Sequence, residues 1–92
     1  LVLLAGHLGE QVEEAYQGRG FGDAAVRVVR EHEPLGTGGA LRQVAGLLDK
    51  RFVMMNGDSF FDINLRALTA SAPPAGGGRL ALRRVEDVSR YG

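Results

Sequence analysis

Residues 33–41 of the chain are EPLGTGGAL, and residues 52–58 are FVMMNGD. The apolar run 52–55, bounded by turn-forming residues, is typical of a buried parallel strand. Asp58 would then lie just beyond the carboxyl end of that strand, where open α/β sheets bind their ligands. The glycines of the first stretch come where a helix is expected to begin, so that backbone N–H groups can approach a ligand closely. Together the two stretches indicate a nucleotide and its metal ion.

Strands and helices alternate along the rest of the chain. Apolar or β-branched runs predict strands at 1–5, 25–31, 52–56 and 80–82, and apolar residues at helical spacing predict helices at 8–17, 38–48 and 65–70. Gly18 should end the first helix, Thr37 should cap the second and Asn64 should cap the third. Such alternation builds right-handed βαβ crossovers. We therefore expect an α/β fold with a three-layer, Rossmann-like, mostly parallel sheet.

The composition of the 92 residues limits the classes of protein to consider. A hydrophobic content of 45% and a charged content of 24% are ordinary for a globular chain and argue against disorder. Because 11 basic residues balance 11 acidic ones, net charge offers no case for a nucleic-acid or membrane partner. The lack of cysteine excludes disulfides and thiolate metal sites, and no apolar stretch approaches the roughly 20 residues that cross a bilayer. We expect a cytoplasmic protein with one small domain.

Three motifs, taken in order, resemble one enzyme family. EPLGTGGAL at 33–41, NGDSFFDINL at 56–65 and VEDVSRYG at 85–92 are similar to motifs of the sugar-phosphate nucleotidyltransferases, above all the guanylyltransferases that act on mannose 1-phosphate or heptose 1-phosphate. The likeness runs along the whole chain. The family's N-terminal Gly-rich signature loop, its later Glu-Lys pair and its second metal-binding Asp have no counterpart in these residues. The resemblance therefore implies that residues 1–92 are an incomplete central part of a nucleotidyltransferase domain.

The resemblance assigns Asp58 to the catalytic metal ion. It implies that Asp58 binds Mg²⁺ and that Asn56 and Gly57 contact the nucleotide. Mg²⁺ suits this assignment, because it takes one or two carboxylates together with phosphate oxygens. From spacing alone, Asp58 is more typical of a turn or a helix cap, since Asn-Gly and Gly-Asp are common turn dipeptides. We interpret Asp62, four residues further on, as a turn residue before Asn64.

The resemblance also implies that the glycine-rich stretch holds the nucleobase and ribose, with Gly36, Thr37 and Gly38 lining the pocket. This stretch has no lysine, which excludes a Walker-type phosphate loop. Glu33 bears on the identity of the base. A carboxylate can accept hydrogen bonds from both N1–H and the exocyclic amine of guanine, whereas uracil and thymine offer only N3–H as a ring donor. Glu33 therefore favours GTP, and a solvated loop acid is the alternative.

Two further pairs of residues are candidates for a functional role. The resemblance implies that Tyr91 and Gly92 contact the sugar, with the glycine N–H near a sugar hydroxyl. His7 and His32 lie apart in the sequence, without metal-ligand spacing and without a nucleophile to activate. We interpret both histidines as ordinary loop residues.

The implied activity is transfer of a nucleotidyl group from a nucleoside triphosphate to a sugar 1-phosphate, with release of pyrophosphate. This chemistry needs positioning and charge neutralisation more than a side-chain nucleophile. The alternative is a non-catalytic nucleotide-binding or regulatory interaction module of the same fold. The sequence leaves open whether the protein forms a homo-oligomer. Because the N-terminal signature loop is missing from residues 1–92, we expect these residues alone to be inactive.

Overall fold

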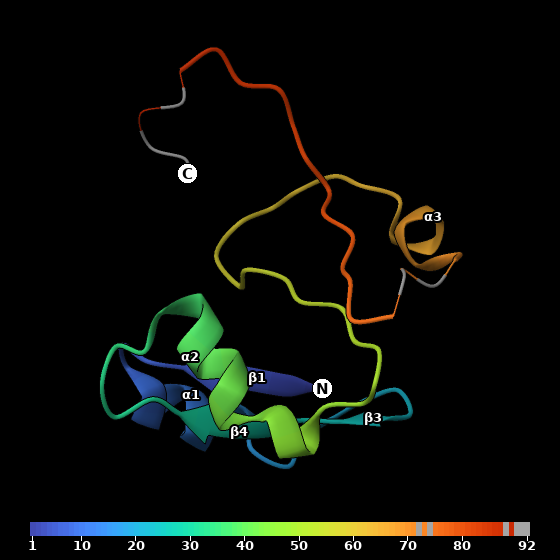
Figure 1. Ribbon diagram of the computed structural model, residues 1–92. Helices are drawn as coiled ribbons and strands as arrows, with labels where there is room; N and C mark the ends of the chain where they lie inside the picture. Colours follow the sequence, from blue (N-terminus) through green and yellow to red (C-terminus); the bar gives the residue numbers. More distant parts are fainter. Residues whose placement is uncertain (72, 74, 88, 90–92) are drawn as a thin grey trace. The chain divides into compact units, whose positions relative to one another are not determined.

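The computed structural model describes residues 1–71, 73, 75–87 and 89. The chain divides into two compact units, Leu1–Met54 and Met55–Gly92 (Figure 1). Each unit is described by itself below. No helix among the described residues is long and apolar enough to cross a membrane.

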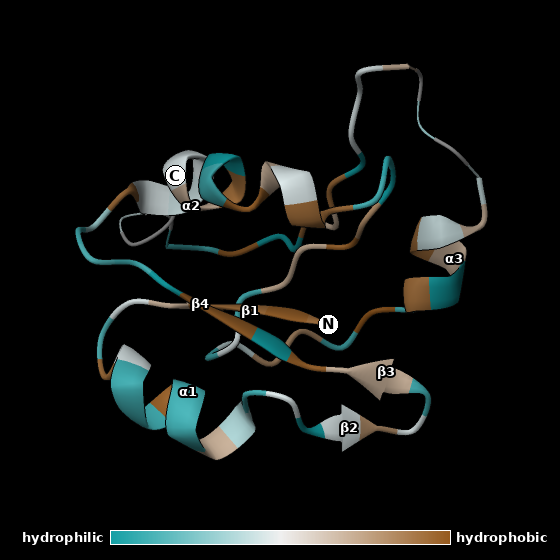
Figure 2. Ribbon diagram, turned by 90° about the horizontal axis from the view of Figure 1, so that it is seen from below, coloured by the Kyte–Doolittle hydropathy of each residue, from teal (hydrophilic) through white to brown (hydrophobic). Residues whose placement is uncertain are grey.

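The first unit is built on a pair of parallel strands. β1 (Val2–Ala5) pairs with β4 (Arg27–Arg30), and Leu3 lies opposite Val28 in the register. Helix α1 (Gly9–Tyr16) connects them and packs on one face of the pair, while α2 lies on the other side (Figure 2). Parallel strands joined through a helix make a βαβ unit, as the alternating pattern predicts. The α/β class and the parallel sheet are confirmed, and the three-layer, Rossmann-like arrangement stays a prediction.

The core of this unit lies between the strands and α1. Ala5, Val26 and Val28 are buried, and Leu3 and Val12 pack against them. Strand residues that face each other in the register point to the same side of the sheet, so alternate residues of β1 and β4 meet the apolar stripe of α1. The positions of the core residues therefore follow from the helical repeat of α1 and from the alternation of side chains along β1 and β4.

Arg30 ties α1 to the end of β4. A Cβ on Gly9 would lie 3.4 Å from the Arg30 Cγ, an ordinary van der Waals distance, so the arginine stem lies against the start of the helix. The guanidinium donates to the Glu10 carboxylate at 2.8 Å and lies 3.7 Å from the Glu13 carboxylate. Helix and strand thus meet at a point that combines close packing with an ion pair.

A short hairpin precedes β4. Strands β2 (Gly20–Phe21) and β3 (Ala24–Ala25) pair in antiparallel fashion around Gly22, whose φ of +58° suits a tight turn. The sequence predicts a single strand over 25–31, but the chain is divided, and β4 begins only at Arg27. Two-residue strands are too short to show any periodicity, which is why the hairpin has no signal in the sequence. Gly18, with a φ of +74°, follows the end of α1 as predicted.

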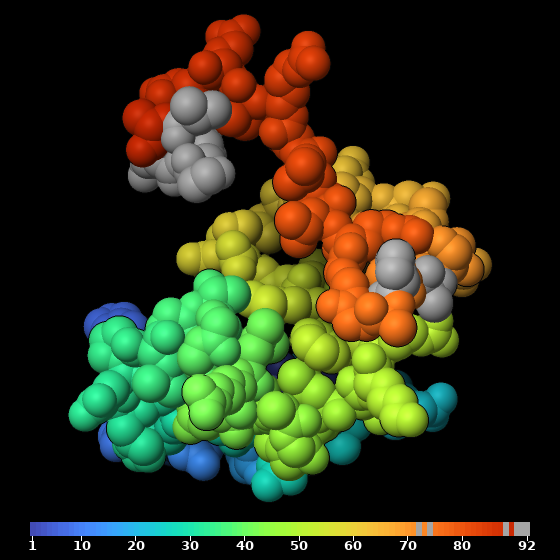
Figure 3. Space-filling model, viewed as in Figure 1, coloured from blue at the N-terminus to red at the C-terminus, as the bar shows by residue number. Residues whose placement is uncertain are grey.

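The helix predicted at 38–48 is present with different ends. It is α2 (Gly36–Gln43), followed by a 3₁₀ turn, η1 (Ala45–Leu47). The prediction that Thr37 caps this helix is wrong. The left-handed backbone of Gly36, at φ +65°, turns the chain earlier, so Thr37 lies inside the first turn. Ala40 is buried, and Val44, just after the helix, is 1% exposed. In the space-filling view, the green residues of α2 lie on the near surface of the first unit (Figure 3).

Two predicted strands are wrong. Within the described part of the chain, no backbone ladder includes 52–56 or 80–82. Phe52 is 51% exposed and Leu82 is 84% exposed, so neither run is buried. A strand needs a neighbouring edge that supplies its hydrogen bonds, and apolar side chains alone do not provide one. Both runs are therefore irregular segments that pair with no strand among the described residues.

In the second unit, the described residues form one helix, α3 (Leu65–Thr69). The Asn64 side chain accepts a hydrogen bond from the Ala67 N–H at 3.0 Å, so the predicted cap is confirmed. Further along, the Arg79 guanidinium donates to the Leu68 carbonyl at 2.9 Å and to the Ser71 hydroxyl at 2.6 Å. These bonds fix the return of the chain onto α3.

Candidate functional site

A hollow of 380 Å³ lies where β1 and β4 end. Because the strands are parallel, both carboxyl ends lie on the same side, and the loops that follow them face one another. The hollow is lined by residues of these two loops: Gly6, His7, Glu31, His32, Glu33 and Pro34. Ligands of open α/β sheets bind at this edge. The hollow is therefore the candidate site of the first unit.

The side chains of the hollow combine hydrogen-bond acceptors with imidazoles. Glu33, the residue predicted to read the base, lines it together with His7 and His32. A carboxylate can only accept hydrogen bonds, whereas a neutral imidazole offers one donor and one acceptor. His7 comes from the loop after β1, and its sequence distance from Glu33 gave no sign that the two residues share a hollow. The set can bind a planar, polar ligand that presents donors and acceptors side by side.

The start of α2 follows this loop directly. Gly36, Thr37 and Gly38 form the first turn of the helix and are exposed. Backbone N–H groups in a first helical turn lack partners within the helix, so they are available to a ligand. A Cβ on Gly39 would lie 2.7 Å from the Leu35 Cβ, which shows how tightly this turn folds back on itself.

Two hydrogen bonds tie α2 and its entry loop to the end of β4. The Gln43 side-chain amide donates to the Arg30 carbonyl at 3.1 Å. The Glu31 carboxylate accepts a long hydrogen bond, 3.4 Å, from the Leu35 N–H. The loop that carries Glu33 is thus held at both of its ends.

Asn56, Gly57 and Asp58 belong to the second unit. Gly57 and Asp58 form a turn, all three residues are exposed, and Asp58 accepts a hydrogen bond from the Ser59 hydroxyl at 3.0 Å. Among the described residues, no group of three acidic, histidine or cysteine side chains is placed to hold a metal ion. A single exposed carboxylate nevertheless fits Mg²⁺, which keeps several waters and takes other oxygens from a phosphate. Asp58 can therefore serve as one protein ligand of such an ion.

The third motif, 85–92, is described only in part. The Asp87 carboxylate accepts a hydrogen bond from the Ser89 N–H at 2.9 Å. This backbone bond, together with the Ser89 hydroxyl, holds the pKa of the Asp87 carboxyl below its ordinary value. Tyr91 and Gly92, the predicted sugar contacts, lie outside the described residues.

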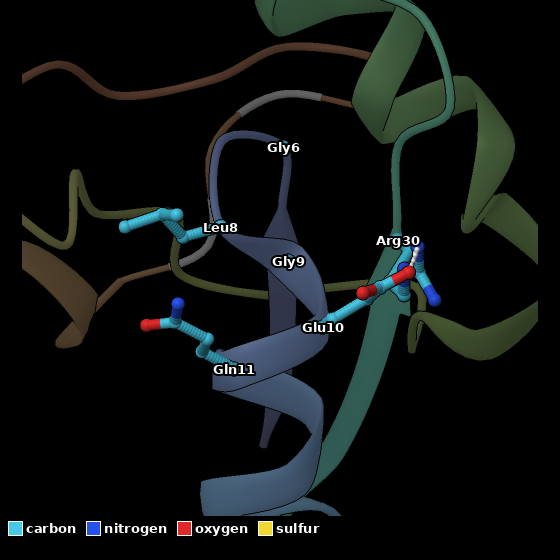
Figure 4. Close-up of a pocket in the computed structure, with 6 residues that line it drawn as sticks. All are labelled: Gly6, Leu8, Gly9, Glu10, Gln11 and Arg30. Atoms are coloured by element: carbon cyan, nitrogen blue, oxygen red, sulfur yellow. Dashed lines mark hydrogen bonds and ion pairs between the residues drawn. The ribbon is translucent and has the colours of Figure 1, made fainter.

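A second hollow, of 290 Å³, lies beside the start of α1 (Figure 4). The Glu10 side chain points toward Arg30 and pairs with it, while Leu8 and Gln11 point away. Leu8 has a φ of +55°, an uncommon backbone conformation for a leucine, directly before the helix. Because its charged groups already satisfy one another, this hollow is a packing feature of α1 and β4.

Comparison with known proteins finds two relatives of this chain. No protein-family model matches the chain, and no solved structure matches it. The chain is 32% identical over 92 residues to a D-glycero-alpha-D-manno-heptose 1-phosphate guanylyltransferase of Campylobacter jejuni and 30% identical over 94 residues to one of Aneurinibacillus thermoaerophilus. Each match covers 100% of this chain and 40% of the relative, so the chain spans less than half the length of these proteins. The resemblance found in the three motifs is thereby confirmed: residues 1–92 correspond to a part of a sugar-phosphate nucleotidyltransferase.

Proposed function

We propose that this chain forms the nucleotide-binding part of a sugar-1-phosphate nucleotidyltransferase. The observation that carries the proposal is the match, along the whole chain, to two proteins named as heptose 1-phosphate guanylyltransferases. The hollow at the carboxyl ends of β1 and β4 supports it, because α/β sheets bind nucleotides at that edge. A Rossmann-like sheet in three layers belongs to the same proposal.

The reaction joins a sugar 1-phosphate to a nucleotide. A phosphate oxygen of the sugar 1-phosphate attacks the α-phosphorus of the nucleoside triphosphate and forms a new P–O bond. The bond from the α-phosphorus to the bridging oxygen breaks, and pyrophosphate leaves with that electron pair. Catalysis of this kind relies on positioning and on neutralising negative charge.

The first unit supplies the base contacts in this proposal. Glu33 accepts hydrogen bonds from N1–H and the amine of guanine, which makes GTP the favoured substrate. Gly36, Thr37 and Gly38 present the exposed first turn of α2 to the nucleotide, where the small residues permit close approach. The names of both relatives agree with a guanine nucleotide.

The second unit supplies the metal ligand. Asp58 holds Mg²⁺ through its exposed carboxylate, and Asn56 and Gly57 contact the nucleotide. When bound, Mg²⁺ neutralises negative charge on the phosphates. Tyr91 and Gly92 contact the sugar, for which the relatives suggest D-glycero-α-D-manno-heptose 1-phosphate.

The proposal is tested by pyrophosphate release in the protein at its full natural length. GTP, Mg²⁺ and D-glycero-α-D-manno-heptose 1-phosphate are the substrates. We expect Asp58→Asn to lower kcat by about 100-fold or more, because a metal ligand contributes several kcal/mol to the transition state. Asp62→Asn is the matched control, since Asp62 is also exposed and four residues away. Residues 1–92 alone should release no pyrophosphate.

Two results would contradict the proposal. Turnover that survives Asp58→Asn would remove Asp58 from the metal site. Tight GTP binding by the full-length protein without any pyrophosphate release would instead support the non-catalytic nucleotide-binding module.

A further inference from the structure

We propose that His7 reads the guanine base together with Glu33; this inference rests on the proposed function and deepens it. His7 follows β1 and Glu33 follows β4, yet both line the same hollow of 380 Å³. A ligand in that hollow would meet a carboxylate from one loop and an imidazole from the other. The sequence separates these residues, and only the parallel pairing of the strands brings their loops together.

The backbone holds His7 in a defined place. The Ala5 carbonyl accepts a hydrogen bond from the Glu31 N–H at 2.9 Å, so the two loops leave the sheet side by side. The Gly6 carbonyl then accepts from the Gly9 N–H at 3.1 Å, which closes a turn with His7 and Leu8 at its centre. His7 is thus fixed between the end of β1 and the start of α1.

The chemistry of the two side chains matches one base. Guanine presents an acceptor, O6, beside two donors, N1–H and the amine, and it carries a second acceptor at N7. The Glu33 carboxylate fits the two donors, and an imidazole N–H fits O6 or N7. Adenine places an amino donor where guanine has O6, and uracil and thymine have one ring donor and no N7. A carboxylate and an imidazole in one hollow therefore select guanine.

His32 provides a matched control. It lines the same hollow but precedes Glu33 on the same loop. A second group that reads a different side of the base is better supplied from the opposite loop, as His7 is. Replacing either histidine removes one imidazole from the hollow, so only a specific contact distinguishes the two variants.

The test uses nucleotide analogues in the full-length protein. 7-Deaza-GTP lacks N7, and 6-thio-GTP replaces O6 with a sulfur that accepts hydrogen bonds weakly. We expect the wild type to prefer GTP over at least one analogue by about tenfold in kcat/KM, as the loss of one hydrogen bond implies. His7→Leu should lose this preference, His7→Gln should restore part of it through its amide donor, and His32→Leu should keep it.

The possible results distinguish a failure of the His7 contact from a failure of the proposed activity. If His7→Leu lowers kcat/KM equally for GTP and both analogues, or keeps the wild-type preference, His7 does not contact the base and the inference is overturned. If the wild type prefers GTP over neither analogue, the inference is likewise overturned. If the wild type releases pyrophosphate from no nucleoside triphosphate, the proposed function fails first. Thermal unfolding of each variant verifies that the compared proteins are folded.

Discussion

The two units of the chain differ in how their apolar side chains are covered. In the first unit, Ala5, Val26 and Val28 are buried beneath α1. In the second unit, Phe60 is 96% exposed and Leu80 is 81% exposed. The difference lies in backbone pairing, because β1 and β4 form a parallel ladder, whereas no ladder is found among the described residues of the second unit.

This comparison shows what a βαβ unit achieves within a short stretch of chain. Helix α1 leaves the end of β1, crosses one face and leads through the hairpin to β4, so one edge of each strand is paired and the apolar face under α1 is covered. The apolar run at 80–82 is as suitable for a strand by composition, but in the described part of the chain its backbone groups pair with no strand. Burial thus depends on a partner as much as on the residues themselves.

The largest effect should separate the roles of the units in catalysis. We expect Glu33→Gln to lower the kcat/KM ratio for GTP over dTTP by about 10- to 100-fold, because one acceptor toward guanine becomes a donor. Asp58→Asn should lower turnover of both nucleotides alike. Parallel kinetics of the two variants provide the measurement. An unchanged GTP/dTTP ratio in Glu33→Gln would show that Glu33 has no part in base choice.

A second effect concerns stability. Val28→Ala should lower the free energy of unfolding by about 2 kcal/mol, because two buried carbon groups are lost and a cavity remains. Leu82→Ala should change it by less than about 0.5 kcal/mol, since Leu82 is 84% exposed. Urea unfolding of both variants tests the contrast. Equal destabilisation would mean that the second unit is covered as well as the first.

A third effect is local to the second unit. Asn64→Ala should cost about 1 kcal/mol of helix stability, because the hydrogen bond to the Ala67 N–H is lost. Asn64→Asp retains a cap acceptor and should be nearly neutral. Hydrogen exchange of the amides in α3 measures both changes. If the α3 amides exchange equally slowly in Asn64→Ala and in the wild type, the Asn64 cap does not determine where α3 begins.

The sequence predicted the elements whose determinants are local or close by. The strands near 1–5 and 25–31, the first helix and the Asn64 cap all follow from periodicity and cap chemistry. The Thr37 cap failed because a left-handed Gly36 redirected the chain, and backbone conformation of a glycine is poorly specified by its neighbours. The strands at 52–56 and 80–82 failed because no side-chain pattern reveals whether a partner edge is present.

The candidate site was predictable only where one motif contains it. Glu33 and the turn at Gly36 follow each other in the chain, so a single motif points to both. His7 had no such signal, because its proximity to Glu33 depends on the register of β1 and β4.

The smallest expected effect lies in the third motif. The Ser89 N–H and hydroxyl stabilise the charged form of Asp87, so the pKa of its carboxyl lies below the ordinary 3.8. Since the folded pKa is lowered, the turn is stabilised above the ordinary pKa, and this stabilisation is lost as the pH falls through the lowered pKa. The group is fully exposed, which keeps the effect small.

An NMR titration of the Asp87 carboxyl carbon tests this assignment. Ser89→Ala removes the hydroxyl but keeps the N–H, so the pKa should return only part of the way toward 3.8. Ser89→Pro removes the N–H, the larger of the two causes, together with the hydroxyl, and should therefore raise the pKa further than Ser89→Ala does. A pKa rise in Ser89→Ala that exceeds half of the rise in Ser89→Pro would contradict the assignment of the backbone bond as the main cause. It would also show that this turn depends on side-chain contacts, unlike the backbone ladder of β1 and β4 that organises the first unit.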